Sequence, residues 1–80
     1  MAPAVFIFET LKFKINANDH SPPHVHVEGK GASVRINLRT LDFMDDETDF
    51  SRGTLDRIMS EVIKRQDELM EEWNKYHEEN

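Results

Sequence analysis

Residues 18–38 read NDHSPPHVHVEGKGASVRINL, and this segment decides the fold of the chain. It holds two alternating apolar and polar runs, 24–28 and 32–38, on either side of the sequence GKG at 29–31. Such alternation is typical of strands with one buried face, and a glycine-rich interruption between two such runs is typical of a hairpin. The segment therefore predicts a pair of antiparallel strands.

The beginning of this segment predicts a stiff loop that leads into a strand. The prolines at 22–23 fix their own φ angles and lack an N–H donor; either bond that precedes a proline can be cis, and trans is expected. Once the strand begins, His24, His26 and Glu28 project from one face and the intervening valines from the other. The valines fit a core, and the rigid turn brings His20 close to the two strand histidines.

The residues before this segment predict two more strands. Residues 4–8, AVFIF, form a short apolar run that is typical of a buried strand, and residues 11–16, LKFKIN, alternate. Glu9 and Thr10 separate the two runs, so a hairpin is expected, although this pair is not a favoured two-residue turn.

Residues 39–50 form an acidic connector with a few apolar anchors. We expect a loop that packs some of its side chains over the sheet edge. A divalent-cation site is the alternative here, but the acidic residues do not match the spacing of a calcium loop, which needs a central glycine and a distal glutamate. The acidic residues are Asp42, Asp45, Asp46, Glu47 and Asp49.

The remainder of the chain predicts one long helix from Ser51 or Thr54 to about His77, with either residue as N-cap. Apolar residues recur at steps of three and four and form a stripe on one face. We expect Leu55, Ile58, Val62 and Leu69 to be buried against Phe6, Phe13, Val34 or Ile36, and Trp73 to anchor the core. A helix of this length overhangs a small sheet, so its last turns cover the sheet edge or contact a partner, and His77 suits the negative end of the helix dipole.

Together these elements predict a single α+β domain over residues 1–80. Its parts are a β-rich half (1–38), the acidic connector (39–50) and the C-terminal helical region (51–80). An antiparallel sheet of about four strands packs one face on the helix. The open face is expected to carry Lys12, Lys14, His24, His26, Glu28, Ser33, Arg35 and Asn37.

Charge and composition narrow the class of protein. The net charge is −6, yet residues 1–41 hold five basic residues against three acidic ones, and residues 42–80 hold five against thirteen. An acidic chain is a poor non-specific binder of nucleic acid, although a locally basic face can hold one phosphate group. The sequence has no cysteine, no recognisable signal peptide and no apolar run of 18 residues. We expect a cytoplasmic protein that does not enter the membrane.

The sequence NDHSPPHVHV at 18–27, together with the strands around it and a helix that carries Trp73, resembles a widespread family of small, mostly bacterial domains of unknown function. The hallmark of that family is Asn-Asp-His-x-Pro-Pro-His-Val-His-Val, often with proline where this chain has Ser21. Members are often encoded beside another small protein. The resemblance implies a toxin–antitoxin-like pair, with this chain as its toxin-like member and a cognate small protein as its partner.

The first hypothesis for the chemistry of the cluster is catalysis on RNA. Imidazoles titrate near neutral pH, so His20, His24 and His26 are candidates for the general acid and base of RNA transesterification. Basic side chains on the same face would bind the phosphate and stabilise its developing charge. These substrate-binding candidates are Lys12, Lys14 and Arg35.

Two other hypotheses remain open. The same three histidines could ligate a transition metal, with Asp19, Glu28 or water as a fourth ligand, although we expect no cofactor. Alternatively the protein is a non-catalytic binding or regulatory module, in which His20 and His24 hydrogen-bond the Pro-Pro turn and Asp19 caps the loop. The sequence does not decide between an enzyme and a binding module, or give the oligomeric state.

Overall fold

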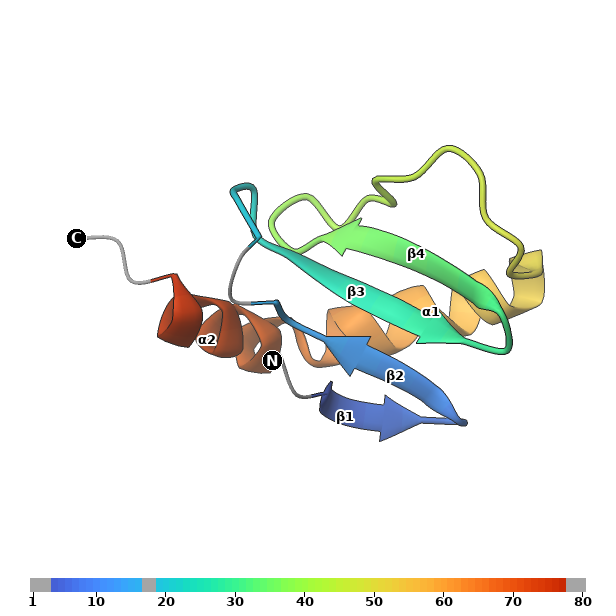
Figure 1. Ribbon diagram of the computed structural model, residues 1–80, viewed down its shortest axis with the longest axis horizontal. Helices are drawn as coiled ribbons and strands as arrows, with labels where there is room; N and C mark the ends of the chain where they lie inside the picture. Colours follow the sequence, from blue (N-terminus) through green and yellow to red (C-terminus); the bar gives the residue numbers. More distant parts are fainter. Residues whose placement is uncertain (1–3, 17–18, 78–80) are drawn as a thin grey trace.

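The computed structural model describes residues 4–16 and 19–77, which form one antiparallel sheet and two helices (Figure 1). The strand order is β1-β2-β3-β4, so each strand pairs with its neighbours in the sequence. The α+β prediction is confirmed. Asn18 of the motif and residues 78–80 of the expected C-terminal region lie outside the described residues. The elements are β1 (Ala4–Phe8), β2 (Leu11–Lys14), β3 (His24–Gly29), β4 (Ala32–Asn37), α1 (Arg52–Lys64) and α2 (Gln66–Tyr76).

Both outer hairpins turn on two residues with positive φ. Lys30 and Gly31 connect β3 to β4 with φ values of 53° and 77°, which suits the right-handed twist of the strands. Glu9 and Thr10 do the same between β1 and β2, with φ values of 51° and 67°. The β1–β2 hairpin was expected although Glu9 and Thr10 are not a favoured pair for a two-residue turn. It places Thr10, a β-branched residue, at a positive φ that such residues rarely adopt.

The alternating residues of the strands lie on the predicted faces. Val25 and Val27 are completely buried, and they belong to one core with Ile58, Val62 and Leu69 of the helices. Leu55 is only partly buried at the margin of this core. On the opposite face, the register aligns Lys12 with Glu28 and Ser33, and His24 with Asn37. The core residues from the strands, and from the positions directly after β2 and β4, are Leu11, Phe13, Ile15, Val25, Val27, Val34, Ile36 and Leu38.

The acidic connector follows the outer edge of β4, as expected from its apolar anchors. Phe43 forms an isolated bridge with Ile36, and the Met44 N–H donates to the Arg35 carbonyl oxygen at 2.8 Å. The Asn37 N–H donates to the Asp42 carbonyl oxygen at 2.9 Å. The connector therefore satisfies backbone groups that an edge strand would otherwise expose.

The prediction of one long C-terminal helix is wrong in one respect, because the helix breaks at Arg65. This residue has φ −112° and ψ 21°, and it ends α1 and precedes α2. Its guanidinium lies 4.1 Å from the ring centroid of Phe6 and donates to Glu61 at 2.7 Å. The next residue, Gln66, donates from its side chain to the Leu38 carbonyl oxygen at 2.7 Å. These contacts fix the break, although the sequence has neither glycine nor proline there.

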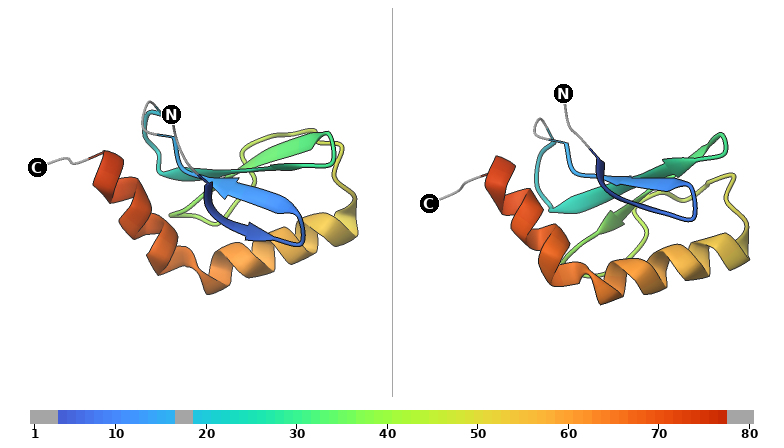
Figure 2. Two further views of the ribbon diagram at one scale, coloured as in Figure 1. Left: turned by 60° about the horizontal axis from the view of Figure 1, so that its bottom comes forward. Right: turned by 90° about the horizontal axis from the view of Figure 1, so that it is seen from below.

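The break determines where α2 goes. Figure 2 shows α1 running along one face of the sheet, while α2 turns away from α1 and rises past the end of the sheet toward the loop before β3. Ser51 caps α1 by accepting a hydrogen bond from the Thr54 N–H, as one of the two expected caps. The last turns of α2 thus lie beside the loop that precedes β3, where an overhang beyond the sheet was expected.

Candidate functional site

Three potential metal ligands converge where the loop enters β3. The Asp19 Oδ2 atom lies 2.8 Å from His26 Nε2 and 3.2 Å from His24 Nε2. The three ligand atoms all lie within 4.8 Å of one another. His24 and His26 are two positions apart on one strand face, and the loop returns Asp19 over them, so the cluster follows directly from the strand geometry.

The loop fixes the orientation of His24. Its Nδ1–H donates to the Pro22 carbonyl oxygen at 2.8 Å, and the Leu38 N–H donates to the Pro23 carbonyl oxygen at 2.8 Å. The Ser21–Pro22 bond is cis, where trans was expected. A histidine whose Nδ1 donates to a backbone carbonyl presents Nε2 as its free or ligating nitrogen. His24 is 5% exposed, so this nitrogen faces only the interior of the cluster.

The end of α2 supports the cluster from one side. The Trp73 ring lies 5.3 Å from the His24 ring, and His77 stacks on Trp73 with ring centroids 3.7 Å apart. His77 Nδ1 lies 3.0 Å from the Trp73 carbonyl oxygen, and Nε2 lies 2.8 Å from the Asp19 carbonyl oxygen. Both nitrogens thus face backbone carbonyl oxygens. His77 therefore ties the helix to the backbone of Asp19, a role that sequence reasoning missed.

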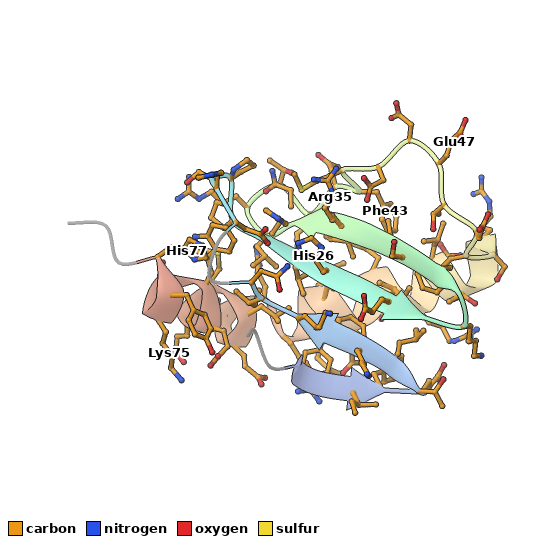
Figure 3. The ribbon with its side chains drawn as sticks, in the orientation of Figure 1. His26, Arg35, Phe43, Glu47, Lys75 and His77 are labelled. Atoms are coloured by element: carbon orange, nitrogen blue, oxygen red, sulfur yellow. The ribbon has the colours of Figure 1, made fainter. Side chains whose placement is uncertain are left out.

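The remaining predicted site residues lie outside the cluster of Asp19, His24 and His26. His20 is exposed and does not belong to the convergent group, so the cluster consists of two of the three predicted histidines and Asp19. Lys14 and Arg35 are the cross-strand partners of His26, whereas Lys12 lies one row away, opposite Glu28. Figure 3 shows His26 and Arg35 on neighbouring strands, on the side of the sheet away from α1.

Both flanking cations are held in ion pairs. Lys14 Nζ lies 2.8 Å from Glu28 Oε2, and Arg35 Nη2 lies 2.7 Å from Asp45 Oδ1. The hydrogen bond from Lys14 is the main cause that lowers the pKa of Glu28 below its ordinary value. The hydrogen bond from the Arg35 side chain lowers the pKa of Asp45 in the same way, and His26 contributes to both shifts. The open face is thus a closely spaced array of charges with His26 at its centre.

Comparison with known protein families gives one match. A model described as a domain of unknown function, DUF4160, covers residues 10–74. The chain belongs to this family. Comparison with curated proteins and with solved structures found no match.

The DUF4160 match spans the whole candidate metal cluster. Asp19, His24, His26 and Trp73 lie within it, while β1 and His77 lie outside it. In the described part of this DUF4160 chain, neither helix is long and apolar enough to cross a membrane.

Proposed function

We propose that Asp19, His24 and His26 bind one divalent transition-metal ion, with zinc as the first candidate. The observation that carries this proposal is the convergence of two Nε2 atoms and one carboxylate oxygen. Ligands of tetrahedral zinc, at about 2.0–2.1 Å from the ion, stand roughly 3.3 Å apart. Two of the three separations, 2.8 and 3.2 Å, are near this value, and all three ligand atoms lie within 4.8 Å of one another, so a small adjustment of the cluster would admit an ion.

The surroundings of the ligands support the same proposal. The hydrogen bond from His24 Nδ1 to Pro22 is the kind of outer contact that orients metal-ligating histidines. The stiff Pro-Pro loop and the contact between His77 and the Asp19 backbone hold the carboxylate in place before any ion binds. Such preorganisation lowers the cost of assembling a site.

The three protein ligands of the proposed site would leave one coordination position of the ion open. Catalytic zinc sites use three protein ligands and leave a further position for water or substrate, and zinc lowers the pKa of a bound water to about 7. The His26 side chain is 27% exposed, whereas His24 is buried, so the free position would face solvent on the His26 side. The Asp19 carboxylate oxygen that does not bind the ion would accept a hydrogen bond from a water there.

Zinc titration of the purified protein tests the proposal. Free zinc at about 100 times its dissociation constant stabilises the folded state by roughly 2.7 kcal/mol, so the melting temperature should rise. Asp19→Asn and His26→Ala should lose this rise, while His20→Ala should keep it, because His20 is the nearby exposed histidine outside the cluster. Unchanged melting of the wild-type protein in excess zinc, with unperturbed imidazole resonances, would reject the metal site.

RNA-directed catalysis by the histidines is the second candidate, and the position of Lys14 and Arg35 beside His26 favours it. The burial of His24 weighs against it, because an acid–base pair must reach both sides of a phosphate. RNA cleavage that persists with a metal chelator and is lost in His26→Ala would support this candidate over the metal site. The toxin-like role and the cognate protein partner stay predictions.

A further inference from the structure

We infer that the solvent side of this site binds a phosphate group through Lys14 and Arg35. The inference rests on the proposed metal site. Lys14 of β2, His26 of β3 and Arg35 of β4 occupy directly opposed positions and form one row across the sheet. Side chains at such positions have Cβ atoms about 4.5–5.5 Å apart and share one face. One ligand can therefore contact all three.

The summed charge of this row and of the three carboxylates that contact it changes from −1 to +1 when a divalent ion binds. With the ion, the positive charges are two on the metal and one each on Lys14 and Arg35. The negative charges are the carboxylates of Asp19, Glu28 and Asp45. Four positive charges against three negative ones leave an excess of one, on the side where the metal keeps an open position. An anion is the ligand that this excess favours.

The existing ion pairs do not prevent the exchange. The Lys14 and Glu28 side chains are 27% and 43% exposed, and those of Arg35 and Asp45 are 42% and 27% exposed. The Lys14–Glu28 pair is a single exposed contact that contributes little to stability, so a competing anion displaces Glu28 at low cost. Arg35 donates to Asp45 from Nε and Nη2, which leaves its Nη1 donors for the anion. Arg35 offers several N–H donors in a planar fork and Lys14 a point charge, and both are groups that bind phosphate oxygens.

The rest of the surface limits the ligand to a compact anion. The groove at the opposite end of the sheet has three acidic residues in its lining, Asp46, Glu47 and Asp49, and their negative charge disfavours phosphate there. The chain as a whole carries a net charge of −6, which disfavours a long polyanion. One phosphate group, free or as part of a small ester, fits these charges.

Cobalt(II) can replace zinc as a spectroscopic probe, because its absorption bands depend on the ligands around the ion. Inorganic phosphate added to the cobalt-loaded protein should change these bands in a saturable way. Lys14→Met and Arg35→Met should each weaken the phosphate response about tenfold or more while cobalt affinity stays the same. Lys12→Met is the matched control, since Lys12 lies on β2 one row from His26 and should leave the response unchanged.

The outcomes separate the two proposals. No protein-bound cobalt bands at all would overturn the metal site. Bands that form but do not respond to phosphate, that respond equally to acetate, or that respond in both variants as strongly as in the wild-type protein would overturn the phosphate site alone. Dimethyl phosphate distinguishes the source: a response equal to that of phosphate supports a diester as ligand, and a response to inorganic phosphate alone supports a terminal phosphate group.

Discussion

The Nε2 atom of His77 lies 2.8 Å from the carbonyl oxygen of Asp19, 58 positions earlier in the chain. This contact joins the end of the last helix to the loop that supplies the carboxylate of the candidate site. It exists because α2 turns at Arg65 and passes the end of the sheet (Figure 2). The helix thus serves the site as well as the core.

His77→Ala should lower the free energy of unfolding by about 1–2 kcal/mol, through the lost hydrogen bond and the lost stacking on Trp73. Tyr76→Ala is the control, because Tyr76 is its neighbour and is 38% exposed; that change should stay within about 0.5 kcal/mol. Urea denaturation measures both. If zinc binds as proposed, His77→Ala should also weaken it by about tenfold. Equal stability of the two variants would contradict a role for His77 in holding the loop.

Two isoleucines of α1 provide a matched test of the core. Ile58 is completely buried, and Ile63 is 53% exposed on the same helix. Ile58→Ala should cost about 2–5 kcal/mol, because it removes buried methyl groups and leaves a cavity. Ile63→Ala should change stability by no more than about 0.5 kcal/mol. Chemical denaturation of both variants would reject the assigned helix face if the two costs were similar.

Two glycines should respond to alanine with opposite signs. Gly31 has φ +77° in the β3–β4 turn, and a Cβ there meets no atom within 4 Å, so the cost of Gly31→Ala comes from the backbone alone. It should destabilise by about 1–2 kcal/mol. Gly53 lies in α1 and is equally free of steric contact, so Gly53→Ala should stabilise by about 0.4–1 kcal/mol through the unfolded state. Thermal melting checks both signs, and a stabilised Gly31→Ala protein would be inconsistent with the turn.

The Arg35–Asp45 pair predicts a dependence of stability on acid. The pKa of Asp45 is lower in the folded protein than its ordinary value of 3.8, so the folded state binds fewer protons than the unfolded state in that range. The contribution of the pair is therefore complete above pH 4 to 5 and is lost as the pH falls through the folded pKa. Urea midpoints of the wild-type protein and of Asp45→Asn should converge between about pH 5 and pH 2.5. A difference that is constant over this range would contradict the assigned shift.

The sequence by itself determined the sheet. Its alternating runs place Val25 and Val27 in the core and His24 and His26 on the other face, because side chains along a strand change sides at every residue. The turn at residues 30–31 then fixes the register in which Arg35 lies beside His26. This information is local, so pattern and turn chemistry suffice to read it.

Only the tertiary structure decided the composition of the candidate site. The sequence predicted that His20, His24 and His26 form one cluster, but the folded loop leaves His20 exposed and brings Asp19 onto the two strand histidines. The helix break at Arg65 likewise has no local signal. It depends on Phe6 and on the Leu38 carbonyl, which are distant in the chain. Contacts between distant segments carry no periodicity, and it is these contacts that bring His77 and Trp73 to the cluster.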